Sequence, residues 1–395
     1  MLEPRQYLQQ IQSMQAEYGA RNSAGRPESE NTDQNELNCI EFASANLRQL
    51  RPDIPLAQHT GIINEILFNQ ARAALDEDSC FLSETTRIID PQDALTTAGR
   101  QPVIFCTYHF GSYRIINQVL GSRGLRYLLP VSSDIYAAHK RRFEDNFAVI
   151  KGYFHTDAQL MVVNAEERTS ALVMARKTRQ GWSLLTYIDG NTGVQGASRR
   201  DAKMLLIPLL GRPMYARRGI AFLSHFLKLP IVPVVCQVTG PLQRRMTFHP
   251  RIEPAASGED REAYCLRATE QLYAVLAEYL KTTPEQWEGW MYLQRHLETD
   301  TFTDPEGEEA ELAIEWNTGD RLVFNHRRFG FIIQENERVL LDKANYKLLS
   351  LPDQIWNMLD SCREPREFNT EAAAEPEREM LEQLVAMELL SIVHS

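Results

Sequence analysis

The sequence has no long apolar run and no apolar leader. No stretch approaches the roughly 18 to 20 consecutive apolar residues that a membrane-spanning helix needs. The N-terminal segment MLEPRQYLQQIQSMQAEYG lacks the apolar core of a secretory signal peptide. We therefore expect a cytoplasmic protein with no membrane span.

Paired cysteines and metal-ligand clusters are also missing. The six cysteines stand at positions 39, 80, 106, 236, 265 and 362, and no two form a C-x-x-C pair. This spacing argues against a zinc ribbon, a redox dithiol or a disulfide framework. We expect reduced thiols, mostly buried as small apolar side chains, and neither a metal ion nor a bound cofactor.

The chain has few basic residues relative to acidic ones. Its formal net charge of −11 makes it a poor candidate for non-specific binding to nucleic acid or to anionic membranes. Two of its basic pairs, Arg141–Arg142 and Arg199–Arg200, are expected to be ordinary solvated surface.

A length of 395 residues allows two or three domains. Residues 1–98 are predicted to be an N-terminal helical region and residues 99–300 an α/β domain. Residues 301–319 are acidic, with proline and glycine, which favours a linker. Residues 320–395 are predicted to form a small α+β module, with short alternating strands, a turn at Glu335–Asn336 and two helices.

The α/β domain is predicted from apolar runs that do not alternate. The runs, separated by helical segments, are PVIFCTYH, RYLLPVS, WSLLTYIDG and PIVPVVCQVTG. Such strands favour a mainly parallel central sheet covered by helices on both faces. AKMLLIPLLG is predicted to be a strand or one arm of a hairpin.

The stretch FCTYHFGSYR places His109 where a predicted strand runs into a glycine-containing turn. Imidazole is well suited to take a proton near neutral pH. In an α/β sheet, ligands bind at the carboxyl ends of the strands. A lone histidine is more often a buried structural residue, but the segments that follow favour a base.

Other candidate residues follow later strands. YIDGNTG puts Asp189 at the tip of one strand, with Asn191 just beyond it. Arg217 and Arg218 precede a predicted helix, whose first N–H groups favour anions. We predict substrate-binding roles for five residues: Gly111, Ser112, Asn191, Arg217 and Arg218.

These segments, in this order, resemble the lysophospholipid acyltransferase superfamily, specifically its lipid A biosynthesis (lauroyl/myristoyl) acyltransferase branch. YHFGSYR looks like the His-Phe-Gly block of that branch, and PEQWEGWMYLQRH like its Pro-Glu-Gln-Trp block. IPLLGRPMYARRGIAFLSHFLKLPIVPVV resembles its Phe-Phe-Gly block with the following helix and strand. The similarity covers roughly residues 45–297 and implies a glycerolipid acyltransferase-like fold.

The resemblance also implies a reaction. His109 would take a proton from an amine or hydroxyl of a small-molecule or peptide natural product. The acceptor would attack the thioester of an acyl carrier protein or coenzyme A without a covalent acyl-enzyme. Backbone N–H groups, or Arg217 and Arg218, would stabilise the oxyanion.

One position departs from the resemblance. The relatives carry an acidic residue five positions after the histidine, and this chain has Arg114 there. Arginine has no acceptor for an imidazole N–H. Asp189 or Glu144 could supply the carboxylate instead. Alternatively, His109 acts without a partner while Arg114 binds an anionic group of the substrate, or the site is not catalytic.

The C-terminal module weakly resembles the PqqD-like fold, a winged-helix-like peptide-recognition element. NYKLLSLPDQIWNMLDSCREPREF carries this resemblance, with Ile355, Trp356, Met358 and Leu359 as its expected core. Such modules bind an extended peptide or carrier segment beside an exposed strand. A packing or dimerisation module is the alternative.

Two other functions remain open. One is an aminoacyl transferase that uses charged tRNA, with the same chemistry at His109; the acidic charge balance argues mildly against it. The other is a catalytically inactive binding protein, in which Arg114 marks lost activity.

Overall fold

The computed structural model describes residues 2–23, 34–190, 204–299, 302, 319–334, 337–367 and 375–394. The chain forms two compact units. The first comprises Met1–Pro27 and Thr60–Leu297, and the second Glu28–His59 and Glu298–Ser395. This division differs from the predicted boundaries, because the N-terminal segments are shared between the units. Most of the predicted acidic linker lies outside the described residues.

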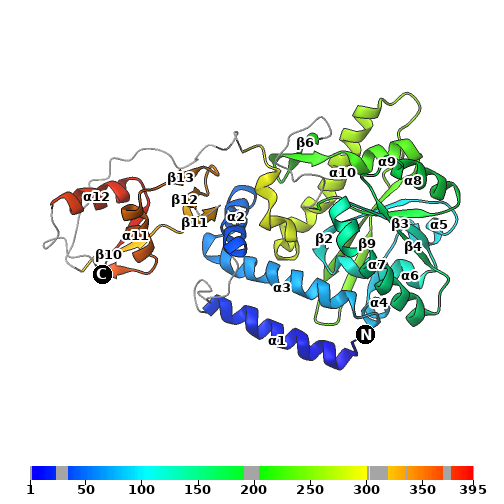
Figure 1. The fold of residues 1–395 in the computed structure, drawn as a ribbon, viewed down its shortest axis with the longest axis horizontal. Helices are drawn as coiled ribbons and strands as arrows, with labels where there is room; N and C mark the ends of the chain where they lie inside the picture. The colour runs from blue at the N-terminus through cyan, green and yellow to red at the C-terminus, as the bar shows by residue number, and fades with distance from the viewer. Residues whose placement is uncertain are drawn as a thin grey trace. The chain divides into compact units, whose positions relative to one another are not determined.

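A seven-stranded sheet forms the centre of the first unit, in the order β1-β9-β8-β2-β5-β3-β4 (Figure 1). The strands are β1 (Arg87–Ile89), β2 (Ile104–Gly111), β3 (Arg126–Val131), β4 (Gln159–Asn164), β5 (Ser183–Tyr187), β8 (Ile231–Val238) and β9 (Arg244–Phe248). Five neighbours, from β8 to β4, run parallel, whereas β9 runs antiparallel to β8 and pairs in parallel with β1. The predicted mainly parallel α/β sheet is confirmed, but the predicted helical region is interrupted by β1.

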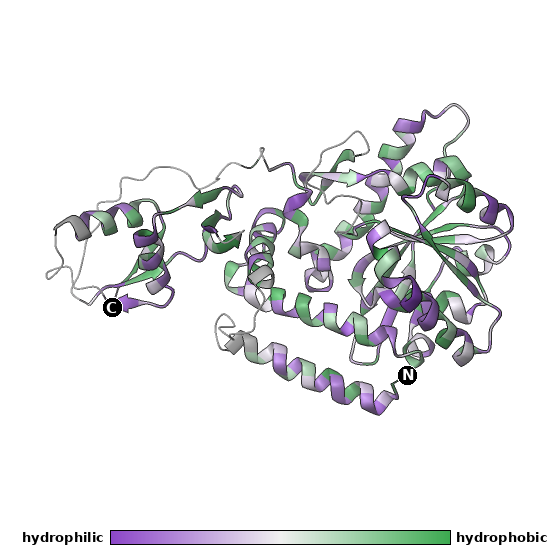
Figure 2. Ribbon diagram, viewed as in Figure 1, coloured by the Kyte–Doolittle hydropathy of each residue, from purple (hydrophilic) through white to green (hydrophobic). Residues whose placement is uncertain are grey.

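Successive residues of the central strands enter two different cores. Phe105 packs into one apolar cluster, while its neighbours Ile104 and Cys106 pack into another. Side chains alternate between the two faces of a strand. Both faces are therefore buried, which explains why these runs are continuously apolar (Figure 2).

Helices cover both faces. The first cluster includes residues of α1 (Pro4–Ser23), α3 (His59–Glu77), α4 (Phe81–Thr85), α5 (Ala94–Ala98), α6 (Ile116–Ser122) and α7 (Ser133–Phe154). The second includes residues of α8 (Ser170–Arg179), α9 (Gly219–Leu227) and α10 (Arg261–Thr282). Two of these helices start at side-chain caps: Ser132 accepts from the N–H of Ile135, and Asp260 accepts from those of Glu262 and Ala263.

Helix α1 lies antiparallel to α3 (Figure 1). Tyr18 contacts Phe68 near one end, with ring centroids 6.0 Å apart. Near the other end the Tyr7 hydroxyl donates to Asp76 Oδ1 at 2.6 Å. The first part of the predicted N-terminal helical region thus forms a helix, α1, which packs on the α/β unit.

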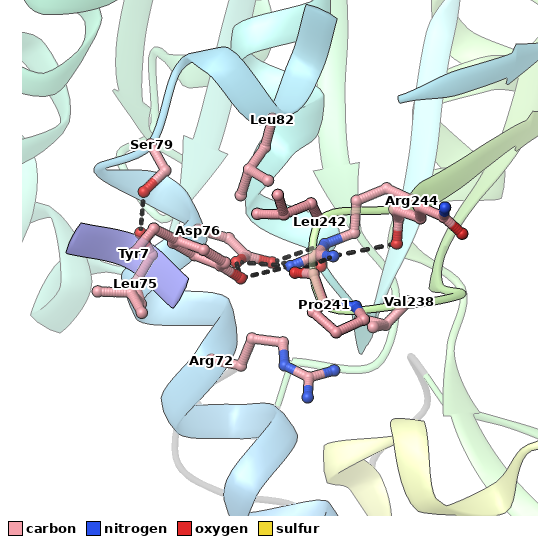
Figure 3. Close-up of polar contacts among 12 residues, drawn as sticks. Tyr7, Arg72, Leu75, Asp76, Ser79, Leu82, Val238, Pro241, Leu242 and Arg244 are labelled. Atoms are coloured by element: carbon pink, nitrogen blue, oxygen red, sulfur yellow. Dashed lines mark hydrogen bonds and ion pairs between the residues drawn. The ribbon is translucent and has the colours of Figure 1, made fainter. Parts of the chain in front are cut away.

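A fully buried ion pair fixes the end of α3 to β9 (Figure 3). Arg244 donates from Nε to Asp76 Oδ2 at 3.1 Å and from Nη2 to Asp76 Oδ1 at 2.9 Å, and neither side chain is exposed. The third guanidinium nitrogen, Nη1, donates to the backbone oxygen of Gly240 at 2.9 Å. A buried pair with its hydrogen bonds satisfied is rigid, and losing one partner leaves an uncompensated charge.

A hairpin precedes α9. Its arms are β6 (Met204–Leu209) and β7 (Arg212–Arg217), paired antiparallel. The turn residues Leu210 and Gly211 have φ values of 49° and 82°, which suits a tight hairpin connection. The predicted strand AKMLLIPLLG is therefore one arm of a hairpin.

The second unit combines two three-stranded sheets with helices. The sheets have the orders β14-β10-β15 and β11-β12-β13. The elements are α2 (Gln34–Leu50), β10 (Arg321–Phe324), β11 (Phe329–Gln334), β12 (Glu337–Asp342), β13 (Leu348–Ser350), α11 (Asp353–Ser361), β14 (Arg366–Glu367), α12 (Glu375–Ala386) and β15 (Leu390–Val393). Trp356 and Leu359 are buried in its core, with Ile355 and Met358 packed against them. The predicted turn at Glu335–Asn336 lies outside the described residues, although Gln334 pairs with Glu337 on either side of it.

Helix α2 belongs to this second unit. Ala45 packs with Ile332 and Leu341, and Lys343 Nζ lies 2.8 Å from Glu41 Oε2 in a buried ion pair. These contacts join positions about 300 residues apart in sequence, which local patterns do not reveal.

All six cysteines are free thiols, and five of them are buried. None of the helices in the described ranges combines the length and apolar character needed to cross a bilayer.

Candidate functional site

His109 lies near the carboxyl end of β2, where regular pairing stops. The pairing of β2 with β8 is regular to Thr107 and shifts before Gly111. Within this irregular stretch the backbone N–H of His109 lies 3.1 and 3.0 Å from the two carboxylate oxygens of Asp189. A local shift of this kind redirects a side chain at the edge of a sheet.

Asp189 follows β5, the neighbour of β2, by two residues. His109 Nδ1 and Asp189 Oδ1 are 2.8 Å apart. The Asp189 side chain is 3% exposed, whereas that of His109 is 23% exposed. The ends of two parallel strands therefore supply an imidazole and a buried carboxylate in direct contact, where α/β sheets usually bind ligands.

The segment after α10 holds Asp189 in place. Trp287 donates from Nε1 to Asp189 Oδ2 at 2.7 Å, and the Tyr292 hydroxyl donates to the Asp189 backbone oxygen at 3.1 Å. Trp287 is buried and its backbone forms an antiparallel bridge with Phe110. Trp287 and Tyr292 belong to the block PEQWEGWMYLQRH, whose pattern alone does not reveal that they contact Asp189.

The surroundings of His109 alter its pKa in opposing directions. Burial lowers the pKa, but the charge and hydrogen bond of Asp189 raise it, and Glu288 adds to this effect. Arg114 opposes the rise, and the net pKa lies above the ordinary histidine value. Asp189 thus stabilises an imidazolium, as a carboxylate partner does in a catalytic triad.

The His109 ring is packed on its sides by two tyrosine rings. Its centroid lies 4.8 Å from that of Tyr113 and 5.1 Å from that of Tyr187. Gly190 leaves room beside the ring, since a Cβ there would lie 3.8 Å from Cε1. Among the described residues, Nε2 accepts or donates no hydrogen bond, so the nitrogen opposite Asp189 is available to a substrate.

Arg114 is engaged elsewhere. Its Nη1 lies 2.6 Å from Glu77 Oε2, and its Nε donates to the Tyr113 hydroxyl at 3.2 Å. Arg142 and Asn146 of α7 also donate to the Glu77 carboxylate, at 3.2 and 3.1 Å. Of the two carboxylates considered in the sequence analysis as partners of His109, Asp189 makes the contact. Glu144, on the surface of α7, lies 3.9 Å from Lys140 instead.

Gly111 and Ser112 hold the end of β2. Gly111 has φ +56°, and a Cβ there would collide with the backbone oxygen of Cys236 and lie 2.8 Å from Gln286 Oε1. The side-chain amide of Gln286 hydrogen-bonds the backbone of Val238 as a neighbouring strand would. Its Oε1 accepts from Val238 N at 2.8 Å and its Nε2 donates to Val238 O at 3.0 Å. Ser112 is fully buried and donates its hydroxyl to Asp76. The contacts of these two residues are therefore structural.

The remaining predicted residues are dispersed. Arg217 ends β7, and Arg218, just before α9, pairs with Glu262 of α10. Burial lowers the pKa of His296, with Arg217 adding to the fall and Asp189 opposing it. The strand that Arg217 ends is joined to His296 by a hydrogen bond from the Tyr215 N–H to the His296 carbonyl oxygen at 2.7 Å. Asn191 lies outside the described residues.

In the described ranges, no group of three or more His, Cys, Asp or Glu side chains is arranged to hold a metal ion. No protein-family model matches the chain, and no curated protein is significantly similar to it.

Proposed function

We propose that this protein is an acyltransferase that moves an acyl group from a thioester donor to an amine or hydroxyl of a small molecule or peptide. The donor is an acyl carrier protein or coenzyme A thioester, and the general base is His109. The observation that carries the proposal is the 2.8 Å contact between His109 Nδ1 and buried Asp189. In the proposed reaction Nε2 of His109 faces the substrate. The α/β unit is then a glycerolipid acyltransferase-like domain.

The geometry supports a direct transfer. Asp189 accepts a hydrogen bond from Nδ1–H of His109, which keeps the proton on Nδ1 and leaves the Nε2 lone pair available. Nε2 takes the proton of the acceptor as its oxygen or nitrogen attacks the thioester carbon. The tetrahedral intermediate then expels the thiolate, which receives the proton back from the imidazolium. In this mechanism Asp189, two residues after β5, takes the role that the resemblance gives to an acidic residue at position 114.

A covalent acyl-enzyme is disfavoured by the neighbouring side chains. Cys106 and Cys236 are buried, and burial raises the pKa of Cys236 to about 12, so its thiol stays protonated. Ser112 is fully buried and donates to Asp76. The nucleophile is therefore assigned to the acceptor substrate.

Residues 320–395, which belong to the second unit, are assigned to recognition of a peptide or carrier segment, as a PqqD-like module. Its two three-stranded sheets end in short strands such as β13 and β14. An extended peptide can add to such an edge through main-chain hydrogen bonds.

The test is acyl transfer by the purified full chain. Acyl-CoA and acyl carrier protein donors of several chain lengths are incubated with mixed amines and alcohols, and acylated products are measured by mass spectrometry. We expect product from the wild type and a loss of at least about 100-fold in His109→Ala. His139→Ala, at an exposed position on α7, is the control and keeps activity. Absence of product with every donor, or equal turnover by His109→Ala, contradicts the proposal.

A further inference from the structure

Glu288 occupies a distinctive place beside the His109–Asp189 pair. It opens the short helix η4 (Glu288–Met291), directly after Trp287 and four residues before Tyr292, the two residues that hold Asp189. Helix η4 contacts β2, which carries His109. The negative charge of Glu288 raises the pKa of His109. In turn, the positive charges of His109 and Arg114 lower the pKa of Glu288.

One oxygen of the Glu288 carboxylate has no hydrogen-bond donor in the part of the chain that the structure describes. Glu288 Oε1 is buried and has no hydrogen-bond partner among the described residues. Tyr113 is a hydrogen-bond partner of the Glu288 carboxylate, whereas Arg114 directs its Nη1 to Glu77. A buried carboxylate oxygen without a donor is unfavourable, so a ligand that brings a donor gains from meeting it.

We propose that Glu288 binds the ammonium group of an amine acceptor and places its nitrogen beside Nε2 of His109. This inference deepens the acyl transfer proposed above and rests on it. An ammonium supplies both a hydrogen-bond donor and a compensating charge to the buried oxygen. An alcohol supplies only the donor, so the site selects amines over alcohols.

The proton count of the reaction agrees with two acceptors. An ammonium must lose two protons before an amide forms. Glu288 takes the first, which frees the nitrogen lone pair to attack the thioester carbon. His109 Nε2 takes the second from the tetrahedral intermediate and returns it to the thiolate as the C–S bond breaks. The proton on Glu288 then passes to water, so an ammonium and a thioester give an amide, a thiol and one proton.

The environment of Glu288 suits this role. Burial raises the pKa of Glu288 above its ordinary value, although His109 and Arg114 oppose the rise. A carboxylate with a raised pKa is a better proton acceptor. An alcohol acceptor carries a single proton, for which His109 alone suffices.

The test measures binding separately from turnover. Butylamine and 1-butanol, which share a chain length, are titrated into the full chain at neutral pH while the His109 ring signals are followed by NMR. His109→Gln identifies those signals. We expect saturable shifts with butylamine, little response to 1-butanol, and butylamine binding at least about ten-fold weaker in Glu288→Gln.

Two further variants make the result decisive. Glu278→Gln removes an exposed carboxylate of α10 that pairs with Lys281, and it is expected to bind butylamine like the wild type. Glu288→Asp keeps the charge and is expected to bind butylamine with an affinity between those of the wild type and Glu288→Gln. This variant keeps the test valid if Glu288→Gln does not fold.

The outcomes separate this inference from the acyl transfer. Equal butylamine binding by wild type and Glu288→Gln, or equal binding of butylamine and 1-butanol, overturns the amine site. Selective butylamine binding with no acylation from hexanoyl-CoA upholds the amine site and counts against acyl transfer. Transfer to 1-butanol in preference to butylamine overturns the amine site while leaving acyl transfer intact.

Discussion

Arg114 Nη1 and Glu77 Oε2 form an ion pair of 2.6 Å between the segment after β2 and the last turn of α3. The preceding residue of α3, Asp76, accepts the Ser112 hydroxyl. Two consecutive carboxylates of α3 thus anchor two residues that follow the His109 strand. The arginine at position 114 has a structural partner, and the carboxylate beside His109 comes from Asp189.

Arg114 and Arg142 both pair with the Glu77 carboxylate. Substitution of Arg114 is expected to destabilise the first unit more than substitution of Arg142. The Arg114 side chain is 31% exposed and that of Arg142 is 53% exposed. Arg114→Met should lower the free energy of unfolding by about 1.5–3 kcal/mol, as for a charged hydrogen bond. Arg142→Met should cost under about 1 kcal/mol, as for an exposed pair. Urea unfolding followed by circular dichroism gives both values, and equal losses would contradict the assignment.

Alanine at Gly111 is expected to be much more disruptive than alanine at Gly124. Both glycines have positive φ, at 56° and 69°, but only at Gly111 would a Cβ meet other atoms. Gly124→Ala should cost about 1–2 kcal/mol through backbone strain alone. Gly111→Ala adds overpacking of about 1–3 kcal/mol and displaces the end of β2. Equal losses of stability in Gly111→Ala and Gly124→Ala would contradict the close approach of Gly111 to the backbone oxygen of Cys236.

Trp287→Phe is expected to slow acyl transfer while preserving the fold. The change removes the indole donor to Asp189 Oδ2 but keeps most of the buried ring. We expect at least a ten-fold lower rate, equivalent to about 1.4 kcal/mol. Trp290→Phe removes the matching donor to the Pro284 carbonyl, so it should cost about 1 kcal/mol of stability and leave the rate of folded enzyme unchanged. An unchanged rate of acyl transfer in Trp287→Phe would contradict the claim that the Trp287 indole N–H positions Asp189.

The sequence predicts the parallel core of the sheet because strands buried on both faces are continuously apolar. The sequence predicts the two strands at one edge of the sheet, β1 and β9, less well. β9 has the sequence RRMTF, in which apolar and polar residues alternate, and β1 is only three residues long. The sequence predicts His109 and Asp189 as candidate site residues because each lies where an apolar strand ends. The contacts from Trp287 to Asp189 and from Glu77 to Arg114 were not found, because they join segments 98 and 37 residues apart.

The pH dependence of kcat/KM in the wild type and in Asp189→Asn tests the central claim most directly. Burial lowers the pKa of His109 and Asp189 raises it, with a net rise. The acid limb of the wild-type profile should therefore fall above the ordinary histidine value of about 6.5. In Asp189→Asn, burial is no longer opposed by that charge, so the acid limb should move to lower pH and the plateau should fall by about 100-fold or more. An acid limb at the same pH in both proteins, with a similar plateau, would contradict His109 as a base oriented by Asp189.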